Sequence, residues 1–169
     1  MAPIEEKFKA IRLLVLDFDG VFTDNHVWID EEGKESVVCD RGDSLGIKML
    51  KEVRPDIRLV VISKETSRVV NARCQKLKIE CYTGIDDKPA TFQRIVEGEK
   101  IPMEQVAFMG NDVNDLECIR RAGIGIAVAD AVSEVKRVAD YVTRHGGGRG
   151  AIRECTDIIL GRATGDAAD

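Results

Sequence analysis

The stretch from Ile11 to Asp24 constrains the fold most, because an apolar run ends there in two aspartates and a glycine. Residues 11–16 are apolar except for Arg12, which is typical of a parallel strand buried on both faces. Asp17 and Asp19 follow at alternate positions, so both carboxylates point to one side if the strand continues to Asp19. An acidic turn is the alternative interpretation, since Asp and Gly are common turn residues.

The paired carboxylates predict a metal site. The carboxyl ends of strands in open α/β sheets face the ligand crevice. Two like charges this close repel each other unless a cation lies between them. Mg²⁺ prefers carboxylate oxygens together with substrate phosphate oxygens. We therefore expect Asp17 and Asp19 to bind Mg²⁺.

The rest of the chain alternates strand and helix patterns, which predicts an α/β fold with a mostly parallel sheet and helices on both faces. Further strands are expected at 57–62, 79–82, 105–109, 124–128 and 141–142. One helix should run from about 40–44 to 53, with Leu45, Met49, Leu50 and Val53 on its apolar face. Thr66 is the expected cap of the next helix.

One segment departs from the alternation. Residues 26–29 and 35–39 flank a Gly-containing loop and predict a β-hairpin after the first strand. Trp28, the only tryptophan, is expected in the hairpin core or in an interface. No linker or internal repeat is visible, so residues 1–169 form one expected domain with a flexible tail over about 161–169.

Composition excludes several classes of protein. The net charge is −5 with no long basic run, which argues against a nucleic-acid partner. The sequence has no run of 18 apolar residues, so we expect no membrane span. Five scattered cysteines suggest reduced thiols and a cytoplasmic location, and two histidines exclude a multi-histidine metal site.

Polar residues that can carry chemistry gather at the ends of successive predicted strands. They are Asp17, Asp19, Ser63, Asn111, Asp112 and Asp115, with Lys88 in a connection between a strand and a helix. In a doubly wound sheet these ends converge on one crevice. The set offers a carboxylate nucleophile, a second carboxylate, metal ligands, a hydroxyl and a cation, which suits phosphoryl transfer.

The same residues resemble, in order and spacing, the four motifs of the haloacid dehalogenase superfamily of phosphohydrolases. The resemblance implies a Rossmann-like fold in which Asp17 attacks phosphorus to give an aspartyl-phosphate. Asp19 would protonate the leaving oxygen and then activate water, while Ser63 and Lys88 hold the phosphoryl group. Mg²⁺ would bind the Asp17 carboxylate, the Asp19 carbonyl and the fourth motif, whose candidate ligands are Asn111, Asp112 and Asp115.

The gaps between the motifs are too short for a cap domain, and the hairpin and residues 147–154 resemble the 3-deoxy-D-manno-octulosonate 8-phosphate phosphatases. This resemblance implies a homotetramer whose hairpins form the subunit contact, with a glycine-rich C-terminal tail reaching a neighbouring active site. Arg149 is then a candidate lid residue acting in trans; a solvated loop charge is the alternative.

Two positions depart from those phosphatases. Asn111 stands where they have an aspartate, so the affinity for Mg²⁺ should fall unless Asp112 or Asp115 compensates. An asparagine at this position is similar to the C-terminal domain of CMP-sialic acid synthetases. Glu65 resembles an acid of phosphatases acting on 2-keto-3-deoxynononate 9-phosphate; the alternative is a charge at a helix N-terminus. We expect Thr23, Lys64, Glu65 and Arg149 to contact substrate.

The sequence therefore predicts a Mg²⁺-dependent phosphatase for a 2-keto-3-deoxy sugar acid phosphate, with the nine-carbon substrate slightly preferred over the eight-carbon one. The alternative is a tetramerisation module of a CMP-sialic acid synthetase with little or no activity. A nucleotide-binding protein without turnover is a third interpretation, and no Gly-x-Gly-x-x-Gly or Walker pattern supports it.

Overall fold

The computed structural model describes residues 3–162, and its sheet confirms the predicted α/β class. The strands of the main sheet are β1 (Leu13–Leu16), β4 (Arg58–Ile62), β5 (Glu80–Tyr82), β6 (Val106–Gly110), β7 (Ile124–Ala127) and β8 (Tyr141–Val142). They are all parallel and lie in the order β5-β4-β1-β6-β7-β8. The first strand is thus central, between β4 and β6, as its apolar sequence requires.

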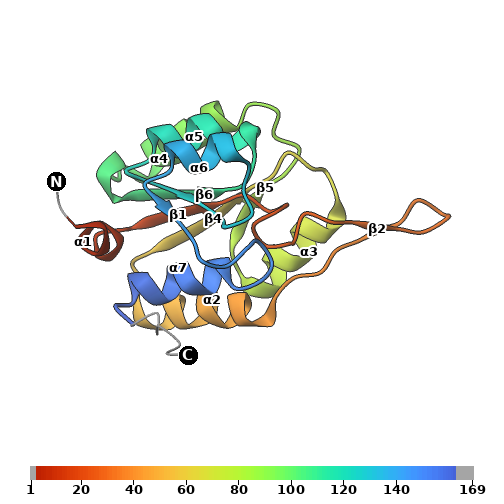
Figure 1. The fold of residues 1–169 in the computed structure, drawn as a ribbon, viewed down its shortest axis with the longest axis horizontal. Coiled ribbons are helices and arrows are strands. Elements are labelled where there is room, and N and C mark those ends of the chain that lie inside the picture. The colour runs from red at the N-terminus through yellow and green to blue at the C-terminus, as the bar shows by residue number, and fades with distance from the viewer. Residues whose placement is uncertain (1–2, 163–169) are drawn as a thin grey trace.

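Helices cover both faces of this sheet. They are α1 (Ile4–Lys9), α2 (Arg41–Val53), α3 (Arg68–Leu77), α4 (Lys88–Glu99), α5 (Leu116–Arg121), α6 (Ser133–Val138) and α7 (Ala151–Ile159), with 3-10 turns η1 (Met103–Gln105) and η2 (Val113–Asp115). Figure 1 shows α4, α5 and α6 above the sheet and α2 and α7 below it. The cap of α3 is Ser67, whose hydroxyl accepts from the Val69 N–H, and not Thr66 as expected.

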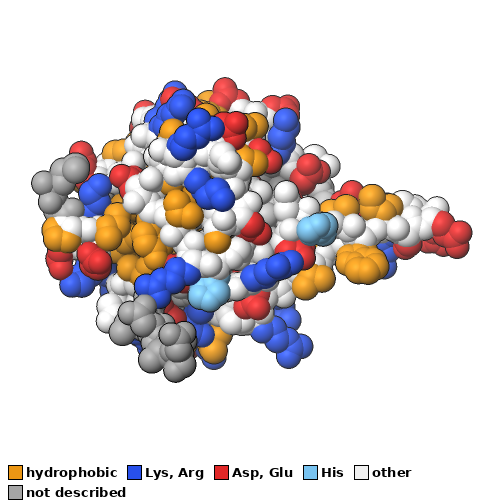
Figure 2. All heavy atoms as spheres, viewed as in Figure 1, with side chains coloured by type: hydrophobic (Ala, Val, Ile, Leu, Met, Phe, Trp, Pro, Cys, Tyr) orange, Lys and Arg blue, Asp and Glu red, His pale blue; other side chains and the backbone are white. Residues whose placement is uncertain are grey.

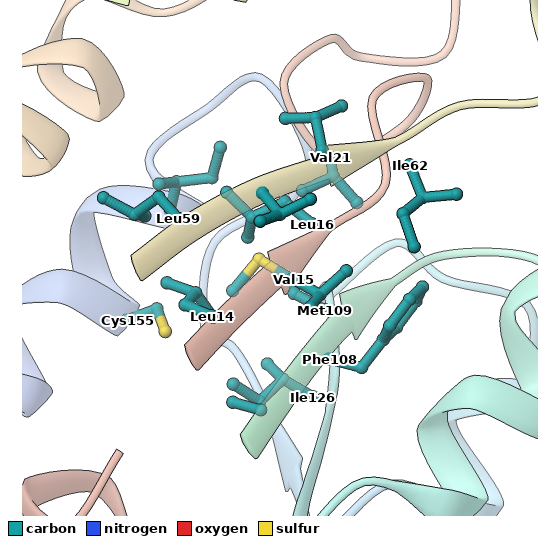
Figure 3. Packing of buried hydrophobic residues seen from close by; sticks show 14 of the residues in the cluster. Leu14, Val15, Leu16, Val21, Leu59, Ile62, Phe108, Met109, Ile126 and Cys155 are labelled. Atoms are coloured by element: carbon teal, nitrogen blue, oxygen red, sulfur yellow. The ribbon is translucent and has the colours of Figure 1, made fainter. Parts of the chain in front are cut away.

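The core is built around β1, whose four side chains are fully buried (Figure 3). Its ladder extends one residue further, since the Asp17 N–H donates to the Met109 carbonyl at 3.0 Å. The chain then turns, because the N–H groups of Val21 and Phe22 both donate to the Phe18 carbonyl. The strand therefore stops before Asp19, and the alternation that would have aligned the two carboxylates does not apply. We call residues 18–22 the catalytic turn, because they contain Asp19, which the sequence predicts to be catalytic.

The predicted hairpin is confirmed as β2 (Trp28–Ile29) and β3 (Glu35–Ser36), which pair antiparallel. A single bridge between Thr23 and Cys39 closes its base, so the hairpin starts beside the catalytic turn. It projects well beyond the body of the molecule (Figures 1 and 2). Trp28 is 73% exposed, which excludes the hairpin core as its location, whereas its expected place in an interface stays a prediction.

The predicted apolar face of α2 is partly wrong. Leu45 and Val53 are exposed, whereas Ile47 and Leu50 are buried. The inner face instead includes Gly46, where a Cβ would lie 2.4 Å from the Thr156 hydroxyl of α7, so close packing between the two helices sets the rotation of α2.

Two further expectations concern the ends of the chain and the membrane. Of the tail expected to be flexible, residues 163–169 lie outside the described residues. Within residues 3–162, no helix has both the length and the apolar character needed to cross a membrane.

Candidate active site

A buried lysine lies between two buried carboxylates at the carboxyl edge of the sheet. The Lys88 Nζ donates to Asp17 Oδ1 and to Asp115 Oδ1, each at 2.7 Å. Asp17 follows β1, Lys88 opens α4 and Asp115 ends η2, so three distant segments meet here. The exposed fractions are 4% for Asp17, 2% for Lys88 and 0% for Asp115. The predicted convergence of these residues is thus present in the structure.

This cluster places one ammonium group against two carboxyl groups. Burial raises the pKa of Asp17, the Asp115 charge raises it further, and Lys88 opposes both. Burial alone would lower the pKa of Lys88, but Asp17 and Asp115 together outweigh it and raise that pKa, which keeps the amine protonated. One ammonium thus faces two carboxyl groups, and the site favours a further cation.

Asn111 lies directly across the catalytic turn. Its N–H donates to Asp115 Oδ2 at 3.0 Å, and its side chain packs against Gly20. Gly20 has φ +81°, and a Cβ there would lie 2.0 Å from Asn111 Nδ2. Only glycine adopts this positive φ without strain and also leaves room for the Asn111 side chain, which explains its place after the two aspartates.

A cleft of about 170 Å³ opens above the cluster. Its lining residues are Asp17, Asp19, Asn25, Lys64, Glu65, Asn111, Asp112 and Asn114. Asp19 thus shares the cleft with Asp17, although not through strand alternation. Burial raises the pKa of Asp19, and the charges of Glu65 and Glu35 add to this effect.

A second hollow of about 260 Å³ adjoins the cleft and shares Asp19, Asn25 and Glu65 with it. Val27, Glu35 and Val37 of the hairpin segment form part of its wall, together with the start of α3. The cleft therefore continues into a space bounded by the hairpin.

The chain is similar in sequence to known hydrolases. Residues 51–151 match the family model of the haloacid dehalogenase-like hydrolases. The chain belongs to this family. It is 36% identical over 160 residues to the 3-deoxy-D-manno-octulosonate 8-phosphate phosphatase of Escherichia coli K12, covering 94% of this chain and 84% of that protein.

Solved structures agree with this assignment. The 3-deoxy-D-manno-octulosonate 8-phosphate phosphatase of Moraxella catarrhalis, solved with magnesium, phosphate and KDO, has a TM-score of 0.89 and 33% identity, covering 94% of this chain and 90% of that one. A putative haloacid dehalogenase family hydrolase from Streptomyces avermitilis has a TM-score of 0.86 and 44% identity, covering 90% and 93%. This haloacid dehalogenase-like hydrolase is accordingly a phosphatase.

The other predicted residues of this phosphatase fall into two groups. Lys64 and Glu65 line the cleft, and Ser63 is fully buried at the end of β4, where its hydroxyl accepts from the Glu65 N–H at 3.2 Å. Asp112 also lines the cleft while its carboxylate accepts from the Val113 N–H. Lys64, Glu65 and Asp112 thus lie in the cleft while Ser63 lies beneath the surface, and their expected roles stay predictions.

Thr23, Asp115 and Arg149 do not line the cleft of this chain. Thr23 is fully buried, and its hydroxyl accepts from the N–H groups of Gly20 and Asn25, so it shapes the loop instead of facing substrate. Both carboxylate oxygens of Asp115 accept hydrogen bonds, Oδ1 from Lys88 and Oδ2 from the Asn111 N–H, so its expected role as a metal ligand stays a prediction. Arg149 is exposed and lies 3.8 Å from Asp24 of its own chain, so its expected role in a neighbouring subunit's site stays a prediction.

Sequence reasoning missed Asn25, Asn114 and Glu35 as residues that line the cleft or the adjoining hollow. Asn114 lies inside the fourth motif block and was the easiest to find. Asn25 has φ +67°, a conformation that asparagine tolerates better than most residues, and its place just after the catalytic turn was a usable signal. Glu35 reaches the hollow only because the hairpin folds beside it.

Proposed function

We propose that this phosphatase removes the phosphate of a 2-keto-3-deoxy sugar acid phosphomonoester with the help of Mg²⁺. The observation that carries the proposal is the buried Lys88, which holds Asp17 at 2.7 Å beneath a cleft lined by oxygen ligands. Such a carboxylate is fixed in place for attack, and a fixed cation beside it favours a phosphoryl group.

The ligand chemistry fits Mg²⁺. Among residues 3–162 no three acidic, His or Cys side chains form a ready-made metal cluster, so the site depends on amide and backbone oxygens beside its carboxylates. We assign the Asp17 carboxylate, the Asp19 carbonyl and the Asn111 side-chain oxygen as ligands, with Asp112 beside them. The relatives from Moraxella catarrhalis and Haemophilus influenzae were solved with magnesium and cobalt, respectively. When bound, Mg²⁺ supplies positive charge to the phosphate oxygens.

The residues of the chain divide the reaction between them. Lys88 holds Asp17 Oδ1, so the other oxygen of Asp17 attacks phosphorus while the bond from phosphorus to the ester oxygen breaks. Asp19, whose raised pKa suits a general acid, gives its proton to the leaving oxygen. Asp19 then takes a proton from water, which attacks the aspartyl-phosphate, releases phosphate and restores Asp17. Ser63 and Lys88 hold the phosphoryl group through both steps.

The named relatives and the adjoining hollow support this class of sugar substrate. The named relatives are 3-deoxy-D-manno-octulosonate 8-phosphate phosphatases. Glu35 and Glu65 both line the hollow, where their carboxylates can accept hydrogen bonds from sugar hydroxyls and would repel a substrate carboxylate. We assign the polyol part of the substrate to this hollow. The position of Glu65, shared by cleft and hollow, supports our preference for a nine-carbon substrate over an eight-carbon one.

Asn111 keeps a second candidate function open, because it contributes no charge to the metal site. The chain would then serve as a tetramerisation module of a CMP-sialic acid synthetase. The hairpin supports assembly under either function, since Val27, Trp28, Ile29 and Val38 are all exposed on it. We propose a homotetramer with the hairpins at the subunit contact.

Phosphate release from a substrate panel separates the two functions. The panel contains nononate 9-phosphate, N-acetylneuraminate 9-phosphate and octulosonate 8-phosphate, each with Mg²⁺ and with a chelator. Asp17→Asn should abolish turnover, whereas Asp86→Asn, at an exposed position, should retain it. Turnover by Asp17→Asn at the wild-type rate would refute the nucleophile. A well-folded tetramer without turnover on any substrate would favour the assembly module.

A further inference from the structure

The glycine-rich segment 146–150 packs against the catalytic turn of its own chain. Gly147 is buried, and a Cβ on it would lie 1.8 Å from the Gly20 carbonyl oxygen. The Gly148 N–H donates to the Val21 carbonyl at 2.9 Å. A Cβ on Gly148 would lie 2.6 Å from the Thr23 carbonyl carbon. Backbone therefore meets backbone here, with no room for a side chain between them.

This contact completes a stack of three layers. Asn111 packs against Gly20 from one side, and Gly147 lies against the carbonyl of Gly20. The catalytic turn, which contains Asp19, is thus held between Asn111, just after β6, and the segment before α7. Because Asp19 directly precedes Gly20, any displacement of this turn also displaces Asp19.

Asp130 holds the glycine segment in place from a third loop. Its Oδ1 accepts from the Gly147 N–H at 2.9 Å, and a Cβ on Gly146 would lie 2.8 Å from its Oδ2. Beyond the segment, Asp43 of α2 accepts from the Arg153 N–H at 2.8 Å. On the other side, the N–H groups of Arg144 and His145, which precede the segment, donate to the Glu154 carboxylate. The segment is therefore anchored at its centre and on both sides.

We propose that Gly147 and Gly148, tethered by Asp130, are positioning residues that hold the catalytic turn so that Asp19 reaches the leaving oxygen and the attacking water. The inference rests on the proposed function, in which Asp19 transfers both protons. Proton transfer and in-line attack depend on sub-ångström placement, and a shift of about 1 Å can cost about a hundredfold in rate. None of residues 146–150 lines the cleft or the adjoining hollow, so the effect of Gly147 and Gly148 passes through the backbone of Gly20 and Val21.

The first test compares two glycine-to-alanine changes in the same chain. Gly147→Ala must push the Gly20 carbonyl aside, whereas Gly98→Ala adds a methyl group where nothing lies within 4 Å. We expect kcat of Gly147→Ala to fall at least tenfold at saturating Mg²⁺ with KM changed less than threefold, and Gly98→Ala to behave as wild type. Wild-type kcat in a folded Gly147→Ala variant would overturn the proposal.

The second test uses the exposed tether and so avoids a folding failure. Asp130→Ala removes the acceptor for the Gly147 N–H, whereas Asp130→Asn keeps a side-chain oxygen there. We expect Asp130→Ala to lower kcat several-fold and Asp130→Asn to restore most of it. Equal kcat in wild type, Asp130→Ala and Asp130→Asn would contradict the tether.

Amide hydrogen exchange over residues 17–24 provides a readout that does not need turnover. Exchange there should be faster in Gly147→Ala and Asp130→Ala than in wild type and Gly98→Ala. If the wild type hydrolyses no substrate, the proposed function fails, and the exchange measurement decides by itself whether the segment holds the turn. Unchanged exchange in both variants would refute it.

Discussion

Replacing Lys88 by methionine should destabilise the fold as well as abolish the activity. Lys88 is the cation that the buried Asp17 and Asp115 share, with both bonds at 2.7 Å. Methionine has a similar length and no charge, so the change leaves two buried carboxyl groups without a counter-charge. Removing one partner of a buried ion pair typically costs about 3–5 kcal/mol. This is a large part of the roughly 5–15 kcal/mol that stabilises a domain.

The loss should depend on pH in a defined direction. Burial and the Asp115 charge already raise the pKa of Asp17 above its unfolded value, and without Lys88 it rises further because nothing opposes them. Protonation then relieves the cost, so the destabilisation is largest under alkaline conditions and shrinks as the pH falls. Adding Asp115→Asn to Lys88→Met removes one of the two charges and should recover about 1–3 kcal/mol.

Urea unfolding of the chelator-treated protein, at about pH 8.5 and about pH 5.5, measures these differences. Lys76→Met, at an exposed position of α3, is the matched control and should stay within about 0.5 kcal/mol of wild type. A Lys88→Met variant as stable as wild type at the higher pH would refute the buried bridge. A loss of stability that is equal at both pH values would refute the electrostatic explanation.

Three further predictions concern the metal, a buried acid and the hairpin. Asn111→Asp adds a charged ligand and should lower the Mg²⁺ concentration for half-maximal phosphate release by about tenfold. The same half-maximal Mg²⁺ concentration in the variant and the wild type would contradict Asn111 as a ligand. Burial raises the pKa of Asp43 to about 6, above its unfolded value, so wild type should lose about 2 kcal/mol of stability as pH rises from about 4 to about 6. Urea unfolding of Asp43→Asn should lack this slope; a slope equal to that of wild type would assign it to another group. Trp28→Ser should lower the mass seen by light scattering if the exposed hairpin is the subunit contact, and an unchanged tetramer would place the contact elsewhere.

Much of the fold could be predicted because its signals are local. The run from Leu13 to Leu16 has no polar face, so only a strand covered on both sides suits it, and the structure places it at the centre of the sheet. The approximate positions of the other strands followed in the same way from apolar runs bounded by Gly, Pro and Asp. The exposed Leu45 shows where local signals fail, since the rotation of α2 follows from its packing on α7.

In the candidate site too, some positions were predictable from local sequence and others were set by tertiary packing. Asp17, Asp19, Lys64, Glu65, Asn111 and Asp112 were all predicted, and all line one cleft. Their spacing around strand ends was enough, because parallel strands bring their carboxyl ends to one edge. The place of Thr23 inside its loop was not predictable, since a hydroxyl can face substrate or close a turn with equal chemistry.

The sequence by itself determined which residues end the central strands and which chemistry they offer, because hydrophobic period and residue type are properties of neighbouring positions. Only the tertiary structure decided that Asp115 supports Lys88 from behind and that Gly147 presses on Gly20. Asp17 and Lys88 lie 71 positions apart, and Gly20 and Gly147 are separated still further. Such contacts depend on which strands become neighbours and how closely two backbones approach, and no local pattern in the chain records either distance.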